Sequence, residues 1–427
     1  MPSDDPLGLG IDLGSSGLRL ALIDQHGQCR AELASDYPAP FADPCGWREG
    51  LRCLCVQLPA ALRAAVVAVA VDGTSGTLAL CRPDGVLLPG SLALALPYHL
   101  ACPEQAEAAA ALAGAAAAGS PAASASGSLA RALRLLALAA GAGESGPWLL
   151  RHQTDWLMGW LLGHWRWGEE GNNLRLGWDP ASAGWMGAIA AQPWRDALPE
   201  IVASGSLLGC LHPGVAAELG LPPDCRVVAG STDASAGVLA ADPRPGDGIT
   251  VLGTTLVMKQ FSPVPLQGPG ISCQRVAGQW LVGGASNAGG AVLRRFFSDP
   301  QLAELSRQID WRRPSGLALR PLPRPGERFP VDDPLLEPVL EPRPVSDALY
   351  LQALLEGLAA IERQGWQRLQ ELGAPPLQRV ISLGGGARNP QWRAIRQRVL
   401  QVPVLNRPGC TAAQGMARLA LSAVAAR

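Results

Sequence analysis

Hydrophobic residues alternate with small or polar residues in two runs near the start of the chain. Leu9, Ile11 and Leu13 form the first run, and apolar positions resume at Leu18 after a glycine and serine turn. Alternation with a period of two is typical of a strand with one buried face, so this stretch predicts a β-hairpin. Residues 66–71, "VVAVAV", are apolar throughout, which predicts a central parallel strand covered on both faces.

The same patterns predict the later elements. A short strand near Val227 leads through a turn at residues 230–233 into a small-residue helix. A second hairpin starts with "ITVLGTTLVMKQF", and a long helix runs from about 347 to 373. A strand, "RVISL", then enters a triple-glycine turn. We also expect one helix over 51–64 and a return strand near 85–90. Strands that alternate with helices predict an α/β fold.

Composition narrows the class of protein. The chain has 427 residues, 48% of them hydrophobic, and a net charge of −1, which predicts two globular domains and no nucleic-acid partner. The ten scattered cysteines fit reduced thiols, and no signal peptide or membrane span is visible, so we expect no membrane partner and a cytoplasmic protein. Lys259 is the single lysine, which excludes a Walker-type phosphate loop.

The first hairpin places Asp12 beside a turn of Gly14, Ser15 and Ser16. A turn of this kind offers closely spaced backbone N–H groups and hydroxyls to an approaching phosphate. The second hairpin repeats the pattern without the acid. Its turn consists of Gly253, Thr254 and Thr255. Two such turns predict a polyphosphate site with the metal on the Asp12 side, although an ordinary hairpin with Asp12 as turn cap has the same sequence.

The triple-glycine turn is followed by Asn389 and Pro390, which predict the N-cap and first residue of a helix. Gly385 and Gly386 beside a helix N-terminus suit a ribose, an adenine or a phosphate, and Trp392 is placed to lie against an adenine ring. The alternative is a plain strand-to-helix turn with a core tryptophan.

Asp233 stands at the start of the small-residue helix, in a turn that leaves a strand. A carboxylate in this position suits a general base that takes a proton from a substrate. The same residue type serves as a helix N-cap, and the two roles are compatible.

Six segments in order, "IDLGSS", "AGSTDASAG", "LGTT", "GGASNAGG", "GERFP" and "LGGGARN", resemble the FGGY carbohydrate kinases. The resemblance implies two ribonuclease H-like domains of the actin-like ATPase fold, with ATP and sugar in an interdomain cleft. It implies that Asp12 holds Mg²⁺ and helps to bind the substrate, and that Asp233 is the general base. The phosphate turns would contribute Gly14, Ser15, Ser16, Gly253, Thr254 and Thr255, and adenosine would contact Gly385, Gly386, Asn389 and Trp392.

The chain resembles the plant and cyanobacterial branch of this family in its short length and in two segments, "DGTSGT" at 72–77 and "PYHLACP" at 97–103. D-Ribulose is the expected substrate of that branch. Ser75 would then contact the ketose, and Asn173 is a further candidate because its loop resembles the sugar-side segment. Two positions depart from the family: Ser15 replaces a threonine, and Thr411 replaces a glutamate, which weakens a nucleotide role at that position.

We therefore expect an N-terminal domain over 1–240, joined by a C-terminal helix at 414–427, and a C-terminal domain over 241–413. The expected reaction is ATP-dependent phosphorylation of D-ribulose. D-xylulose or another polyol is the nearest alternative substrate, and an actin-like ATPase switch without kinase activity is the alternative from another class. The sequence does not reveal the oligomeric state.

Overall fold

The computed structural model describes residues 5–115 and 120–425, which form two compact units. Unit 1 comprises the described residues up to Ala240, a short segment Arg275–Gly278, and the residues from Thr411 on. Unit 2 comprises Ala241–Gln274 and Gln279–Cys410. Unit 2 is thus an insertion into the sequence of unit 1.

Unit 1 is built on a six-stranded sheet in the order β11-β12-β4-β1-β2-β3. The three strands β1, β4 and β12 are parallel, and β2, β3 and β11 pair antiparallel with their neighbours. The strands are β1 (Leu7–Leu13), β2 (Leu18–Asp24), β3 (Cys29–Ser35), β4 (Val66–Gly73), β11 (Leu207–Cys210) and β12 (Arg226–Thr232). The predicted hairpin and the central parallel strand are both confirmed.

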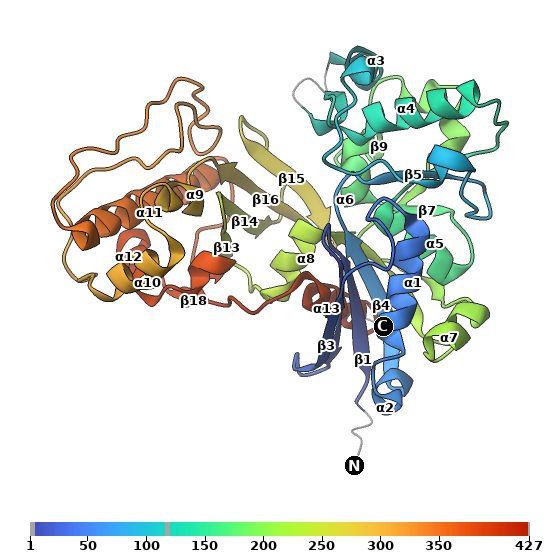
Figure 1. Ribbon diagram of the computed structural model, residues 1–427, viewed down its shortest axis with the longest axis horizontal. Helices are drawn as coiled ribbons and strands as arrows, with labels where there is room; N and C mark the ends of the chain where they lie inside the picture. The colour runs from blue at the N-terminus through green and yellow to red at the C-terminus, as the bar shows by residue number, and fades with distance from the viewer. Residues whose placement is uncertain (1–4, 116–119, 426–427) are drawn as a thin grey trace. The chain divides into compact units, whose positions relative to one another are not determined.

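Helices cover both faces of this sheet. They are α1 (Pro44–Cys55), α2 (Ala60–Ala64), α5 (Gln153–Leu162), α7 (Pro213–Leu219), α8 (Asp233–Ala240) and α13 (Ala412–Ala425). On one face α1 and α5 bury Trp47 and Trp156 against the strands. On the other face α13 packs against β1 and α8, as the red helix beside β1 in Figure 1 shows. The close packing of α13 requires glycine in β1, because a Cβ at Gly10 would lie 1.8 Å from the Ala413 carbonyl oxygen.

A smaller α/β layer of unit 1 follows β4. It contains α3 (Ala106–Ala113), α4 (Ser128–Gly141), α6 (Glu170–Asn173), the strand pair β5 (Leu78–Cys81) and β6 (Leu149–His152), the pair β7 (Trp167–Glu169) and β10 (Glu200–Val202), and the pair β8 (Trp178–Asp179) and β9 (Gly184–Trp185). Its 3₁₀ turns are η1 (Gly90–Ala93), η2 (Pro103–Gln105), η4 (Pro121–Ala123), η5 (Leu174–Leu176), η6 (Ile189–Ala191) and η7 (Arg195–Ala197).

Unit 2 repeats the strand pattern in the order β15-β16-β14-β13-β17-β18. Its strands are β13 (Asp247–Leu252), β14 (Leu256–Ser262), β15 (Ile271–Val276), β16 (Gln279–Ser286), β17 (Arg379–Leu383) and β18 (Val404–Asn406). Its helices are α9 (Gly290–Arg294), α10 (Asp299–Arg307), α11 (Asp347–Glu371), α12 (Pro390–Leu400) and the 3₁₀ turn η8 (Gly385–Arg388). In both sheets three antiparallel strands (β1, β2 and β3; β13, β14 and β16) lie beside two parallel strands (β4 and β12; β17 and β18), and the α/β ribonuclease H-like fold class is confirmed.

Two local predictions are wrong. The expected helix over 51–64 is divided into α1 and α2, because Pro59 has no N–H to continue the first helix and stands at the start of the second. Residues 85–90 form no regular strand; a single bridge joins Cys81 to Leu87, and Gly85 turns the chain at φ +77°. Within residues 5–115 and 120–425, no helix is long and apolar enough to cross a membrane.

Candidate functional site

The parallel strands of unit 1 bring acidic residues to the same edge of the sheet. Asp12 on β1 lies opposite Asp72 on β4, and Asp72 lies opposite Ser231 on β12. On its other side Asp12 pairs with Arg19 of β2, whose Nη1 lies 3.2 Å from Asp12 Oδ2. In open α/β sheets ligands bind at this carboxyl edge of the strands. The site therefore begins with two adjacent carboxyl groups and one arginine.

Both carboxyl groups are buried. Asp12 is 6% exposed and Asp72 is 0% exposed. Within residues 5–115 and 120–425, neither oxygen of Asp72 has a hydrogen-bond partner. Burial raises the pKa of Asp72 well above its ordinary value, and repulsion from Asp12 and Asp233 adds to the effect. Burial also raises the pKa of Asp12, although Arg19 acts in the opposite direction. Buried carboxyl oxygens without partners are costly, so this arrangement favours a cationic or hydrogen-bonding ligand.

The turn beside Asp12 is open. Ser15 and Ser16 are exposed, and Tyr37 donates its hydroxyl proton to the Gly14 carbonyl oxygen at 2.8 Å, which fixes the start of the turn. A Cβ on Gly14 would lie 3.1 Å from the Gly17 oxygen, so glycine keeps the turn compact. The serine hydroxyls lie beside Asp12 in sequence and are free to meet a ligand.

Asp233 is the first residue of α8, and its side chain is exposed. Its Oδ1 accepts a hydrogen bond from the Ala234 N–H at 2.7 Å, so the carboxylate caps its own helix as well as facing solvent. Loss of hydration from the surrounding protein raises the pKa of Asp233, and repulsion from Asp12 adds to this, while the Ala234 N–H and the Arg175 charge lower it. A raised pKa on an exposed carboxylate suits a general base.

Ser75 lies in the turn after β4, and the structure places it next to Arg175 of η5. The Arg175 Nε donates to Ser75 Oγ at 3.2 Å. The turn itself is held by hydroxyl and amide contacts: Thr74 Oγ1 and Thr77 Oγ1 lie 2.7 Å apart, and Thr74 N and Oγ1 both donate to Gln153 Oε1. Ser75 is the half-buried hydroxyl of this turn that stays available.

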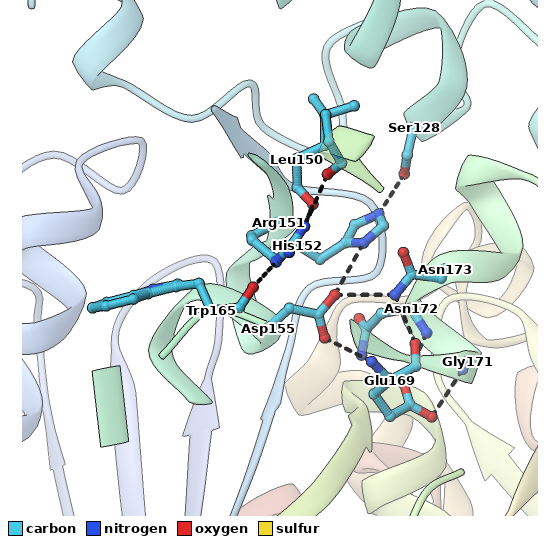
Figure 2. Close-up of polar contacts among 11 residues, drawn as sticks. Ser128, Leu150, Arg151, His152, Asp155, Trp165, Glu169, Gly171, Asn172 and Asn173 are labelled. Carbon is cyan, nitrogen blue, oxygen red and sulfur yellow. Dashed lines mark hydrogen bonds and ion pairs between the residues drawn. The ribbon is translucent and has the colours of Figure 1, made fainter. Parts of the chain in front are cut away.

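Asn173 lies in a buried polar network (Figure 2). Its Nδ2 donates to Asp155 Oδ2 at 3.0 Å and to the Glu169 carbonyl oxygen at 2.9 Å. The Glu169 carboxyl group accepts from the N–H groups of Gly171 and Asn172, both at 2.8 Å, and so caps α6. Burial raises the pKa of Glu169 to about 8. The amide nitrogen of Asn173 is thus used inside unit 1, and its Oδ1 has no partner.

The same network contains a serine, a histidine and an aspartate in the order of a hydrolase triad. His152 Nε2 lies 2.9 Å from Ser128 Oγ, and His152 Nδ1 lies 3.5 Å from Asp155 Oδ2 (Figure 2). The three side chains are 0%, 1% and 0% exposed, respectively. A catalytic nucleophile must be accessible to its substrate, and these three side chains are buried, so they do not form a hydrolase active site. Their contacts instead hold α4 and α5 together.

In unit 2 the second hairpin turn adjoins α9. The Gly290 N–H donates to the Gly253 carbonyl oxygen at 2.9 Å, and the Ala291 N–H donates to the Thr254 oxygen at 3.2 Å. The Thr254 side chain is exposed, and that of Thr255 is half-buried. Gly253 and Thr254 line a cavity of about 880 Å³ that lies within unit 2.

The triple-glycine turn forms another part of this cavity wall. Gly385, Gly386, Asn389 and Trp392 all line it. Asn389 is the N-cap of α12: its Oδ1 accepts from the Trp392 N–H at 3.0 Å, and its Nδ2 donates to Ser306 Oγ at 2.8 Å. The predicted N-cap is therefore confirmed. Trp392 is only 3% exposed and belongs to the core, yet its Nε1 has no partner.

The acidic edge of unit 1 also fits a magnesium ion. Mg²⁺ binds through one or two carboxylates and takes its other ligands from water and phosphate oxygens. Asp12 and Asp72 supply hard oxygen donors side by side, and the Asp72 oxygens accept no hydrogen bond from the part of the chain that the structure describes. Among the described residues no cluster of three or more potential ligands exists, so any ion here depends on water or substrate oxygens.

The sequence places Asp72 at the carboxyl end of its strand, where ligands bind in open α/β sheets, but it does not single out Arg175. A charged residue directly after six apolar positions was a visible signal for Asp72. Arg175 had no such signal, because it meets Ser75 only through contacts across 100 positions of sequence.

Solved structures share this fold. The chain aligns with a xyloylose kinase from Brucella ovis at 22% identity and a TM-score of 0.80, over 99% of this chain and 91% of that one. It aligns with a xylulose kinase from Rhodospirillum rubrum at 22% identity and a TM-score of 0.80, over 99% of this chain and 90% of that one. It aligns with a Plasmodium falciparum glycerol kinase with ADP at 13% identity and a TM-score of 0.78, over 99% of this chain and 90% of that one. The fold is thus that of two-domain sugar and glycerol kinases.

Residues 248–424 match the C-terminal domain of the FGGY family of carbohydrate kinases. This match covers the second hairpin, the triple-glycine turn and α13. The match covers the C-terminal part of the chain, and the solved kinase structures share the fold of nearly the whole chain.

Proposed function

We propose that this chain transfers the γ-phosphoryl group of ATP to the terminal hydroxyl of D-ribulose and forms D-ribulose 5-phosphate. The observation that carries the proposal is the exposed Asp233 carboxylate of α8, in the same unit as the buried pair Asp12 and Asp72. An ATPase without an alcohol substrate needs no base at this point.

In this reaction Asp233 accepts the proton of the sugar hydroxyl as its oxygen attacks phosphorus. The neighbouring Arg175 favours the ionised carboxylate, which is the form that accepts a proton. Such a positioned base contributes about 10²–10⁴-fold to the rate. Ser75 and Asp12 would hold other hydroxyl groups of the sugar, and Asn173 is a weaker candidate because its amide nitrogen already donates inside the protein.

Phosphoryl transfer depends mainly on alignment and on neutralisation of charge. Asp12 would hold Mg²⁺, which when bound neutralises phosphate oxygens. The turns of Gly14, Ser15 and Ser16 and of Gly253, Thr254 and Thr255 would donate N–H and O–H groups to the phosphates. The cavity of unit 2 would receive the adenosine, with Gly385, Gly386, Asn389 and Trp392 on its wall.

D-Ribulose is favoured by the short chain and by "DGTSGT", whose Ser75 remains available in the structure. D-Xylulose is the second candidate, since solved structures named xylulose kinases share the fold. The two pentuloses are epimers, so their discrimination depends on one or two hydrogen bonds.

The test measures ADP release by the full chain with ATP, Mg²⁺ and D-ribulose, D-xylulose, glycerol or gluconate, and identifies the product by ³¹P NMR. We expect the highest kcat/KM with D-ribulose and a sugar 5-phosphate as product. Asp233→Asn is expected to lose transfer and keep ATP binding. The matched control is Asp224→Asn, which changes an exposed aspartate between α7 and β12. ATP hydrolysis that no sugar or polyol accelerates would instead indicate an ATPase switch.

A further inference from the structure

The sugar site of unit 1 is rich in hydrogen-bond acceptors. Ionised Asp12 and Asp233 accept hydrogen bonds from sugar hydroxyls and donate none. Asp72 is fully buried and lies opposite Asp12 across the strand pair. A ketose differs from the matching polyol by one carbonyl oxygen, which only accepts hydrogen bonds. A carboxylate therefore repels this oxygen, and recognition of a ketose requires a donor.

Two other arginines of unit 1 already have acceptors in the protein. Arg19 pairs with Asp12. Arg131 is 0% exposed, and its guanidinium donates to the carbonyl oxygens of Leu100, Gly76, Tyr98 and Ser126. Arg131 is thus buried and used inside unit 1, and Arg19 is held at its Nη1 by the Asp12 carboxylate.

Arg175 is differently placed. Its Nε donates to Ser75 Oγ, and its charge is near enough to Asp233 to lower the pKa of that carboxyl group. Its two Nη groups make no hydrogen bond to residues 5–115 or 120–425. Gly76 leaves room for the side chain, because a Cβ there would lie 3.2 Å from Arg175 Cδ.

The backbone that carries Arg175 is held firmly. It follows Asn173, whose side chain is fixed by Asp155 and Glu169 in the network of Figure 2. The Gly177 N–H then closes η5 by donating to the Asn173 and Leu174 carbonyl oxygens. The buried network therefore positions a charged donor, and this accounts for so many polar groups at the base of a sugar site.

We propose that Arg175 is a specificity-determining residue that donates its Nη hydrogens to the carbonyl oxygen of a ketose and so selects ketoses over polyols. The inference rests on the proposed function of the same site. It adds the residue that recognises the keto group of the substrate.

The test compares kcat/KM for D-ribulose with that for ribitol and D-arabinitol, the two products of its reduction at C2. Arg175→Met is expected to lower the ketose-to-polyol ratio about 10- to 100-fold, the range for a lost hydrogen bond to a charged donor. Arg175→Lys is expected to keep a higher ketose-to-polyol ratio than Arg175→Met, since lysine keeps the positive charge but lacks the paired N–H donors of the planar guanidinium. Arg195→Met, which changes an exposed arginine of η7, is the matched control.

Three outcomes overturn the inference. The first is an Arg175→Met variant that loses activity on ketose and polyol equally, because the arginine would then act only through Asp233 or on folding. The second is a ketose-to-polyol ratio of kcat/KM that falls in Ser75→Ala and is unchanged in Arg175→Met. The third is a wild-type chain that phosphorylates polyols and no ketose. A wild-type chain that prefers another ketose refutes only the D-ribulose assignment, and the same ratio for that ketose and its polyols still decides the role of Arg175.

Discussion

The buried ion pair between Glu362 of α11 and Arg396 of α12 offers a sharp test of what stabilises unit 2. The two side chains are 1% and 0% exposed. Arg396 Nε and Nη2 donate to the two carboxylate oxygens at 2.6 and 2.7 Å, and its Nη1 donates to Ser382 Oγ at 2.6 Å. Thr250 Oγ1 also donates to Glu362 Oε1, at 2.5 Å. One pair thus joins two helices to strands β13 and β17.

Removal of one partner leaves the other charge buried without compensation. Such a change costs about 3–5 kcal/mol. For a domain of this size each kcal/mol shifts the melting temperature by roughly 2–4 °C, so Glu362→Met is expected to lower Tm by roughly 6–20 °C. Glu371→Met, near the end of the same helix, is the control, because the Glu371 carboxylate is 65% exposed and pairs only with Arg368 on the surface.

The double variant Glu362→Met with Arg396→Met distinguishes the charge effect from lost packing. Replacement of both partners by apolar side chains removes the unpaired charge, so the double variant is expected to be more stable than either single variant. Thermal unfolding followed by circular dichroism measures all three. Single variants that melt within 2 °C of the wild type, or a double variant as unstable as the two single changes added together, would refute this reasoning.

Three further predictions concern unit 1. Activity should rise with pH as Asp233 ionises, with the acidic limb of kcat/KM centred above the ordinary aspartate value of 3.8; an Asp233→Asn variant that keeps the same limb contradicts the base assignment. Burial raises the pKa of Glu169 from 4.5 to about 8, so the free energy of unfolding, measured in urea, should fall as pH rises across this range and should fall less in Glu169→Gln. Gly10→Ala should destabilise the protein by at least about 1–3 kcal/mol, because the added Cβ clashes with Ala413. Gly237→Ala in α8 has open space around the added Cβ and should stabilise the protein by up to about 1 kcal/mol. Equal melting temperatures for these two variants would be inconsistent with the packing of α13.

The sequence predicted the elements whose pattern is local. The hairpin at Asp12, the buried strand before Asp72 and the cap at Asn389 each depend on a few neighbouring residues, and the structure confirms them. The break at Pro59 was also a local signal, and it outweighs the helical period of the residues around it.

The arrangement of the site was harder to predict, because contacts between distant segments decide it. The register that sets Asp12 against Asp72 joins strands 60 positions apart, and only tertiary packing determines such a register. The contact between Ser75 and Arg175 depends on the fold of the intervening α/β layer. Likewise, the sequence marked Asn173 as a candidate sugar ligand, and it contained no sign that Asp155 and Glu169 would already engage its amide nitrogen.

The position of α13 has a consequence for how the protein is made. Met416 and Leu419 of this helix cover Ala68, Ala70 and Val228 of the first sheet, but all of unit 2 is translated before they emerge from the ribosome. Until then the nascent chain exposes an apolar sheet surface whose cover is still unsynthesised. We therefore expect unit 1 to complete its folding only after α13 has emerged, and chaperones that shield apolar segments to bind the growing chain during that interval.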